Sequence, residues 1–323
     1  MTPSIVQAGI GVVIAATLGG CATVGGGGLT SGDACDRDCL LATLDAHLAA
    51  VAANDPSHAR LAPGFRATEN AVDVAPGDGT WASVTGLGDV QRRYADAALG
   101  MVGYFGTVTE GDALTMVSVR LKVEDRAVTE AEWIIARDDM VFFNPEGFAA
   151  NAPPQARAEG QPVPSRLVAL AGADSYFSGI DESDGSIVRA HSDCARIENG
   201  TMTVGRLPSM PVRAPDHDAA GDGVTGPLSS QPASSCNSGF DNLRNVTEAV
   251  INRRYFVDPQ AGVAWGTGIF RRVEGYRTSQ GGVLPWLYLT EVFAIEDERV
   301  RSIHAVMTYL PDDITTSGWP DEE

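Results

Sequence analysis

The chain has 323 residues, of which 44% are hydrophobic, and this is enough to bury the cores of two ordinary domains. Its formal net charge is −19, and its paired arginines are scattered along the chain instead of forming a basic cluster. Because phosphate binding needs a basic face, this composition argues against nucleic acid as a partner. The sequence contains no Gly-x-Ser-x-Gly motif, phosphate loop or dinucleotide fingerprint, so we expect no cofactor.

The first 21 residues are typical of an export signal. The apolar run over residues 10–18 is too short to span a bilayer and is followed by Gly-Gly-Cys, ending at Cys21. This ending resembles the bacterial lipobox, which implies lipidation of Cys21. The preceding segment lacks Lys and Arg, so an ordinary cleaved signal or a short anchor is the alternative. We expect an exported, lipid-anchored envelope protein (outer membrane or periplasm in a Gram-negative cell), with residues 22–34 as a flexible tether.

Four other cysteines remain, at positions 35, 39, 194 and 236. An even number in an exported chain predicts two disulfides, and three pairings are open from the sequence. We favour Cys35–Cys39 as a local clip and Cys194–Cys236 as a staple across a long insertion. A zinc site is the alternative, but the cysteine spacings match no zinc motif and the histidines do not cluster, so we expect no metal.

The sequence contains an internal repeat. Residues 45–70 align without a gap with residues 174–199. Six aligned positions are identical: Asp45/Asp174, Asp55/Asp184, Ser57/Ser186, Arg60/Arg189, Glu69/Glu198 and Asn70/Asn199. An Arg-Arg-Tyr motif and then a Glu-Asp turn follow in both copies, in the same order and with a growing offset. The conserved order predicts a duplicated domain, with insertions in the second copy.

Each copy predicts the same order of elements. A helix, over residues 40–53 and again over 165–182, has apolar residues at three- and four-residue spacing. A short helical stretch, a strand ending at Glu-Asn and three strands joined by hairpins follow. This order predicts the α+β class: two tandem cone-shaped domains whose N-terminal helices pack on a curved, mostly antiparallel sheet.

The composition also predicts the domain boundaries. The first domain is expected over residues 35–150, and a Pro- and Ala-rich linker over 151–161. The second domain is expected over residues 162–323. It carries a loop insertion at 201–236, which is dense in Gly, Pro, Ser and Asp.

This order of elements resembles the nuclear transport factor 2-like fold. Ketosteroid isomerase, scytalone dehydratase, limonene-epoxide hydrolase and the SnoaL-like polyketide cyclases share that fold. The resemblance covers residues 35–150 and 162–312. It implies a conical pocket, which the family uses for isomerases, lyases, hydrolases and non-catalytic binding.

The resemblance places an isomerase-type site in the second copy. The family's oxyanion tyrosine, on the first helix, matches Tyr176, whereas the first copy has His47 there. The family's catalytic carboxylate, at the end of the first strand, matches Asn199, and an amide cannot serve as a general base. We therefore expect Asn199 to orient a substrate, and Glu198, one residue earlier, to face the opposite side of the strand.

Glu291 is the third candidate. It stands alone in an apolar row on one face of its predicted strand, where the first copy has Val119. A carboxyl so placed should have a raised pKa and donate a proton. The position matches the protonated Asp of the family's oxyanion hole. The alternatives are an ion pair with an arginine such as Arg254, or a strand bulge that turns the side chain outward.

The remaining candidates are less specific. His304, on the last strand, is assigned an acid or base role, with a solvent-facing histidine as the alternative. Arg254, Tyr255 and Trp265 are assigned to ligand binding. The alternative for the Arg-Arg-Tyr motif is a structural arginine paired with the strand-end glutamate, Glu198 in the second copy. The alternative for Trp265 is a core or rim aromatic.

These observations favour an envelope-anchored lipoprotein that binds a small apolar or aromatic molecule or acts as a non-catalytic scaffold. The alternative is a cofactor-free lyase, dehydratase or isomerase in which Tyr176 and Glu291 donate to a developing oxyanion. The first copy would then be structural or a dimerisation partner, and the pattern is compatible with a dimer. The expected partners are a small ligand and, through the N-terminal lipid, a membrane.

Overall fold

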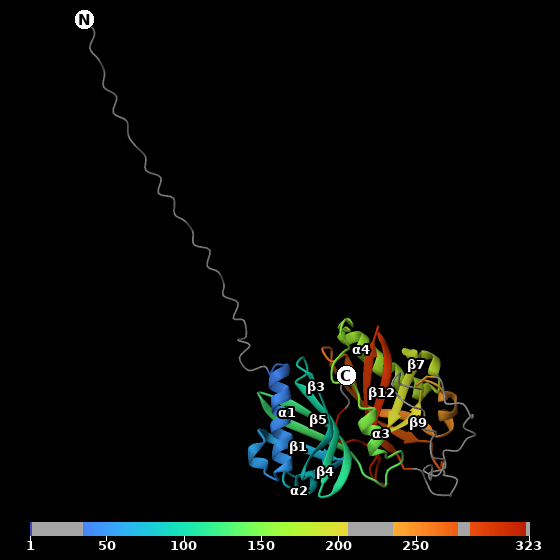
Figure 1. Cartoon of the computed structure of the whole chain (residues 1–323), viewed down its shortest axis with the longest axis horizontal. Helices are drawn as coiled ribbons and strands as arrows, with labels where there is room; N and C mark the ends of the chain where they lie inside the picture. Colours follow the sequence, from blue (N-terminus) through green and yellow to red (C-terminus); the bar gives the residue numbers. More distant parts are fainter. Residues whose placement is uncertain (2–34, 206–234, 277–284, 321–323) are drawn as a thin grey trace. The chain divides into compact units, whose positions relative to one another are not determined.

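The computed structural model describes residue 1 and residues 35–205, 235–276 and 285–320 (Figure 1). The expected export signal, Cys21, the tether and most of the loop insertion therefore lie outside the described residues. Within the described part of the chain, no helix is both long and apolar enough to cross a membrane.

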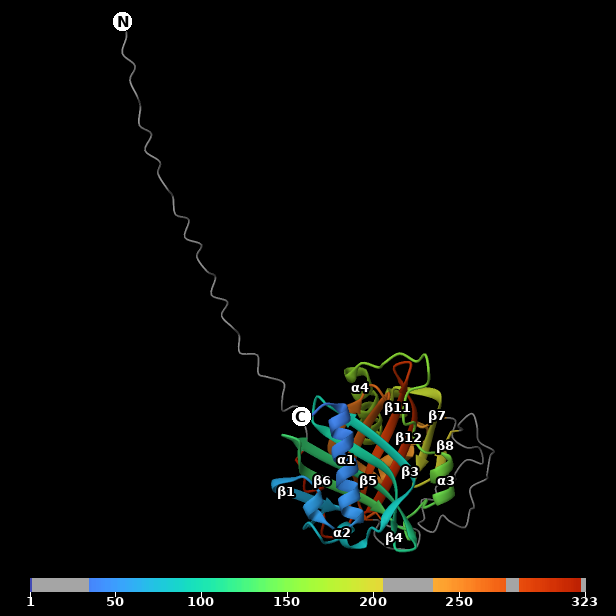
Figure 2. The ribbon, with the colours of Figure 1, turned by 60° about the vertical axis from the view of Figure 1, so that its left-hand side comes forward.

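The first domain places one long helix on a six-stranded sheet. Its elements are α1 (Arg37–Ala52), the 3-10 helix η1 (Pro56–His58), β1 (Leu61–Glu69), β2 (Val72–Val74), α2 (Thr80–Ser83), β3 (Gly86–Asp96), β4 (Met101–Glu110), β5 (Ala113–Glu124) and β6 (Ala127–Ala136). The strand order is β2-β1-β6-β5-β4-β3, and only the β1–β6 pair is parallel. Figure 2 shows α1 lying across this sheet.

The second domain repeats the same architecture after a short helix α3 (Pro145–Ala150). Its elements are α4 (Arg166–Glu182), η2 (Gly185–Ile187), β7 (Ala190–Glu198), β8 (Thr201–Val204), η3 (Phe240–Asn245), β9 (Thr247–Asp258), β10 (Val263–Arg272), β11 (Leu287–Glu296) and β12 (Arg299–Tyr309). The strand order β8-β7-β12-β11-β10-β9 is that of the first sheet. The predicted α+β duplication is confirmed. Strand β8 occupies the first four residues of the predicted loop insertion.

Local sequence signals explain where these elements begin and turn. Asp36 and Ser165 cap the two long helices by accepting from main-chain N–H groups three residues later. The repeated Asp55 and Asp184 accept from the serine N–H groups that open η1 and η2, as expected of turn residues. The hairpin turns at residues 125–126 and 297–298 have positive φ at both positions, as tight two-residue hairpins require.

The repeated asparagines at the ends of β1 and β7 hold the sheets together. Both have positive φ, and both direct their amides at the main chain of the neighbouring strand. Asn70 Oδ1 accepts from Ile135 N (2.8 Å), and Asn199 Oδ1 accepts from Met307 N (3.0 Å). Asn199 Nδ2 also donates to the oxygens of Met307 (3.0 Å) and Val141 (3.1 Å). The repeat therefore preserves a structural amide at this position.

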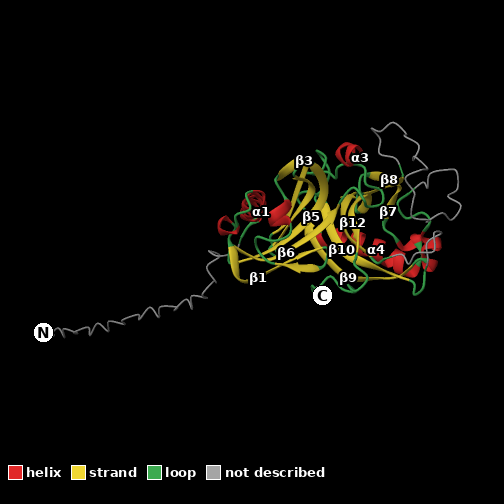
Figure 3. Cartoon of the chain, turned by 90° about the horizontal axis from the view of Figure 1, so that it is seen from below, coloured by secondary structure: helices red, strands yellow, loops and turns green. Residues whose placement is uncertain are grey.

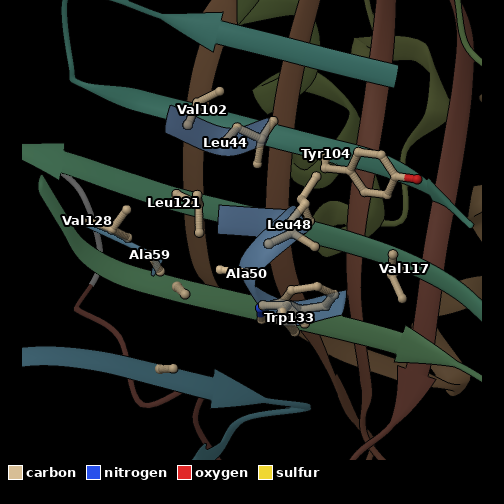
Figure 4. Close-up of a cluster of buried hydrophobic side chains, with 14 of the residues drawn as sticks. Leu44, Leu48, Ala50, Ala59, Val102, Tyr104, Val117, Leu121, Val128 and Trp133 are labelled. Carbon is tan, nitrogen blue, oxygen red and sulfur yellow. The ribbon is translucent and has the colours of Figure 1, made fainter. Parts of the chain in front are cut away.

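Each helix covers the apolar inner face of its own sheet. Figure 4 shows the first domain, where Leu44 and Leu48 of α1 lie over side chains of β4, β5 and β6. Trp133 of β6 fills the space below Leu48 and Ala50. A second inner core forms between α4 and β9–β12 in the second domain.

The outer faces of the two sheets pack against each other in a third core. Strand β6 lies against β12, and β3 lies against β9. Figure 3 shows α1 and α4 on the outer sides with the strands between them. Both faces of each sheet are therefore buried.

The sheet registers correct the alignment of the Arg-Arg-Tyr motif by one residue. Followed across the paired strands, Arg93 rather than Tyr94 corresponds to Tyr255. Arg92 therefore corresponds to Arg254. Arg93 and Tyr255 bond the same repeated aspartate on the helix of their own domain. Both β3 and β9 carry a register shift just before the motif, which letter identity does not reveal.

The predicted linker is docked along the first sheet. Gln155 donates to Arg93 O (2.7 Å) and accepts from Arg93 N (3.0 Å), so its amide continues the pairing at the edge of β3. Arg92 Nε donates to Pro153 O (2.7 Å), and Tyr94 Oη donates to Pro154 O (2.7 Å). These bonds cover an edge strand that would otherwise expose unpaired main-chain groups.

Both favoured disulfides are present. Cys35–Cys39 closes the start of α1, and Cys194–Cys236 joins β7 to the chain beyond the insertion. Disulfides persist in oxidising compartments and are rare in reducing ones. The protein is therefore suited to a non-cytoplasmic, oxidising environment.

Candidate functional site

Two of the predicted site residues, Tyr176 and Glu291, face the inside of the second domain. Tyr176 lies on α4 beneath Phe240 and Phe293, with ring centroids 5.2 and 5.6 Å away. Glu291 lies on β11 and is 2% exposed. The predicted apolar row around this carboxyl is confirmed, because the neighbouring residues on the same face belong to the inner core.

The carboxyl of Glu291 is poorly satisfied. Its Oε2 atom is buried without a hydrogen-bond partner among the described residues. Burial and the nearby Glu198 raise the pKa of Glu291 well above its usual range, and Arg196 opposes this shift. Neither alternative arises: Arg254 bonds elsewhere, and the β10–β11–β12 register passes through Glu291 without a bulge. The neutral acid is the favoured form.

Arg196 completes the site, and it was not predicted from the sequence. Its Nη1 donates to Tyr176 Oη (3.2 Å), and its Nε donates to Thr203 Oγ1 (3.1 Å). Its Nε also lies 3.6 Å from Glu198 Oε1. Burial raises the pKa of Tyr176, so its hydroxyl stays protonated and can donate a hydrogen bond.

The expected orientation of Glu198 is wrong. Strand alternation from Asn199 suggested that Glu198 points away from the site. Its neighbours instead place it with Arg196 on the inner side, where its charge acts on Tyr176 and Glu291. Glu198 and Asn199 do differ in direction, as the alternation predicted, but Glu198 is the residue that faces the site. The carboxylate at the end of this strand therefore faces the site, and the amide next to it does not.

Asn199 does not reach the cluster. Its side-chain oxygen and nitrogen are both used by main-chain bonds to β12 and to residue 141. The assignment of a substrate-orienting role to Asn199 is not supported by this geometry. Its counterpart Asn70 makes the same kind of bond in the first domain, so the two residues share a structural role.

Three further candidates lie on the outer face of the second sheet, against the first domain. Trp265 stacks on Phe256 at 5.1 Å, as the core alternative predicted. Arg254 bonds Glu132 of the first domain, so the expected pairing with Glu198 is wrong. His304 is buried instead of facing solvent. Burial, and to a smaller extent a nearby arginine, lowers its pKa to about 3 and keeps it neutral.

Tyr255 is the one ligand-binding candidate on the inner face. Its hydroxyl donates to Asp174 Oδ1 (3.0 Å), and its ring lies 5.9 Å from that of Phe177. Arg253 also contacts Asp174, at 3.3 Å. Tyr255 therefore helps fix α4 on β9, in the same cross-strand row as Glu291 and two strands away from it.

The first domain has an apolar version of the same site. Val119 replaces Glu291, and Ala67 replaces Arg196. His47 takes the place of Tyr176, and its ring packs edge-on against Trp81 at 5.3 Å. Burial lowers the pKa of His47 to about 4, so this imidazole is neutral. Trp133 fills the position that the small Ala305 occupies in the second domain.

The Tyr176–Glu291 cluster is closed over by protein. Two surface hollows of the described residues lie elsewhere: one between β4, β5 and the chain around α3, the other between η2 and the β11–β12 turn. Neither is lined by Tyr176 or Glu291. Among the described residues, no group of His, Cys, Asp and Glu is arranged to hold a metal ion.

The comparisons with known proteins single out the same domain. A family described as a domain of unknown function (DUF8021) matches residues 163–307. The match covers α4 and most of the second sheet, including Tyr176, Arg196, Glu198 and Glu291. The comparison with curated proteins gave no match.

Proposed function

We propose that this chain is an exported, lipid-anchored binding protein built from two nuclear transport factor 2-like domains. The second domain takes a small, mainly apolar or aromatic molecule with one polar group, which meets Glu291, Tyr176 and Arg196. The first domain supports the second and holds no ligand. The helix-on-curved-sheet order of both domains supports the fold assignment, and the Leu-Gly-Gly-Cys sequence ending at Cys21 supports the lipid anchor.

The observation that carries this proposal is the buried Oε2 atom of Glu291, which has no hydrogen-bond partner among the described residues. Leaving a buried polar group without a partner costs about 1–3 kcal/mol, and at Glu291 this atom belongs to an acid that stands in an apolar row beside Tyr176 and Arg196. Apolar side chains are compatible with the same position, because Val119 occupies it in the first domain. A ligand carbonyl or hydroxyl that accepts from neutral Glu291 and Tyr176 would satisfy both groups.

The ligand class follows from the lining of the site. Phe240, Phe293 and Met307 supply aromatic and apolar contacts around the polar groups. Such a lining suits planar or fused-ring molecules with one oxygen, such as phenols, terpenoids and steroid-like enones. Polyanions are disfavoured because Glu198 and Glu291 both face the site.

The binding test is a thermal shift screen of the mature protein against these three compound classes. A ligand should raise the melting temperature of the wild type, because binding to the folded state stabilises it. Glu291→Val, which copies the first domain, should abolish the shift. Val119→Ala, at the matched position of the first domain, should leave it unchanged. Equal shifts in the wild type and in Glu291→Val would contradict the assignment.

The lipid anchor has its own test. Cys21→Ser should move the protein from the membrane fraction to the soluble fraction, and mass spectrometry should find the wild-type N-terminus acylated. Finding the wild type unacylated would refute the anchor but not the ligand site.

A second candidate function is acid–base catalysis, which the inward position of Glu198 favours. Two carboxyl groups would then face one ligand, a neutral buried one at Glu291 and an arginine-paired one at Glu198. Glu198 would remove a proton beside a carbonyl while Tyr176 and Glu291 donate to the oxygen. In heavy water, a bound enone should exchange that proton for deuterium with the wild type. Exchange that continues in Glu198→Gln would exclude this role.

A further inference from the structure

The contact between the two domains is self-complementary. Equivalent strands meet each other across it, since β6 lies against β12 and β3 lies against β9. A contact in which each patch meets its own counterpart is the arrangement of a twofold dimer. Here it joins two halves of one chain.

The main-chain bonds across this contact are reciprocal. Asp96, the last residue of β3, accepts from Val257 N through Oδ2 (2.9 Å). Asp258, the last residue of β9, accepts from Ala95 N through Oδ2 (3.0 Å). Both aspartates are almost fully buried. Each domain therefore gives to the other the same bond that it receives.

The first residues of the two long helices also form reciprocal bonds across the contact. Arg37, the first residue of α1, donates to Asp258 (2.8 Å from Nη2). Arg166, the first residue of α4, donates to Asp96 (2.5 Å from Nη1). Four polar contacts thus obey one approximate twofold relation, which chance divergence would not produce.

Within the paired sheets, two departures from this symmetry make the two sides of the contact different. The first is steric. Trp265 corresponds in the sheet register to Gly103, and a Cβ atom on Gly103 would lie 2.8 Å from the rings of Trp265 and Phe256. Two copies of the second domain would bring two tryptophans together at this point. Two copies of the first domain would leave a void there.

The second departure is electrostatic. Glu132 of β6 accepts from Arg254 and Tyr288 of the second domain and from Arg120 (2.6 Å) of its own. The counterpart of Glu132 on β12 is the neutral His304. Two copies of the second domain would therefore leave Arg254 buried without a carboxylate, which is strongly unfavourable.

We infer that the chain is a fused heterodimer whose interface accepts only the unlike domain. Trp265 in the Gly103 hole and Arg254 on Glu132 stabilise the unlike pair and disfavour either like pair. The outer sheet faces, occupied in this way, are not free for a second copy of the chain. This inference does not depend on the proposed ligand.

The test cuts the folded full chain at one place. A protease site inserted after Glu159, in the exposed part of the linker, separates the domains, and both disulfides of the described residues lie within single domains. After cleavage the fragments should co-elute at the mass of the whole protein. After unfolding and refolding with the disulfides kept, native mass spectrometry should find 1:1 unlike pairs at least tenfold over like pairs. Separation on cleavage, or statistical pairing, would overturn the inference.

A second experiment uses the intact chain, so that it does not depend on the solubility of the separated fragments. Gly103→Trp should sharply lower the urea midpoint, because two tryptophans then meet. Adding Trp265→Gly then places the tryptophan in the first domain and the glycine in the second. The double variant should regain at least half of the lost midpoint if the twofold relation holds. A double variant no more stable than Gly103→Trp would contradict that relation.

Discussion

The two domains share a fold but differ in what their helices cover. Under α1, Trp81 and Trp133 fill the space, and the buried ring of His47 packs among aromatic side chains. Under α4, the smaller Ala305 stands where the first domain has Trp133, and polar side chains gather around Glu291. The scaffold positions stayed constant, while the polar groups under the two helices differ: a neutral imidazole in the first domain, and a carboxyl, a phenol and a guanidinium in the second. The duplication therefore left one fold with two different sets of side chains under its helices.

The largest loss of stability is expected from a change at the interface between the two domains. Removing Glu132 with Glu132→Ala leaves Arg120 and Arg254 buried without their shared carboxylate. We expect a loss of about 3–5 kcal/mol in the free energy of unfolding, measured by urea denaturation. The control is Glu130→Ala, which removes a partly exposed partner of Arg120 and should cost less than about 1 kcal/mol. Equal effects would show that the buried network is not what joins the domains.

The two disulfides offer a second comparison. Cys194–Cys236 closes a separation of 42 residues, and Cys35–Cys39 closes one of 4. Chain-entropy arithmetic gives about 4 kcal/mol for the long loop and about 2 kcal/mol for the short one. Double Cys→Ser variants of each pair, compared by urea denaturation, should keep this order. A larger loss from the short clip would mean that it holds α1 in place by more than loop closure.

Acidification should destabilise the first domain through His47. Its pKa is lowered from 6.5 to about 4 in the folded protein, so the unfolded chain binds more protons between these values. The contribution of neutral His47 to the free energy of unfolding is therefore fully present above about pH 6.5. It falls by about 3 kcal/mol as the pH drops towards 4. His47→Phe should remove this part of the acid sensitivity. His304→Phe, at the interface, should leave the His47 contribution in place, and an unchanged acid profile in His47→Phe would contradict the assignment.

Much of this fold could be predicted from the sequence because its signals are local. The hairpin turns and the inward position of Glu291 follow from spacing within one strand or turn, and the repeat and the cysteine pairs can be read from residue identities along the chain. What could not be predicted depends on partners far along the chain. Arg254 and Glu132 lie 122 positions apart, and each looks like a solvated charge on its own strand. Arg196 was missed because nothing next to it in the sequence marks its partner Tyr176.

The smallest predicted effect on stability concerns Glu291. Its dependence on pH has the opposite sign to that of His47. Its pKa in the folded protein lies above its ordinary value of 4.5, so the folded state binds more protons than the unfolded chain. This group's stabilisation is present below about pH 4.5 and is lost as the pH rises through the folded pKa. Glu291→Gln should therefore gain stability over the wild type as the pH rises towards neutrality. Urea titrations from pH 4 to pH 8 measure this difference, with Val119→Ala as the flat control. A difference that does not change with pH would mean that the carboxyl is already ionised and satisfied. The proposal that it awaits a ligand would then lose its main support.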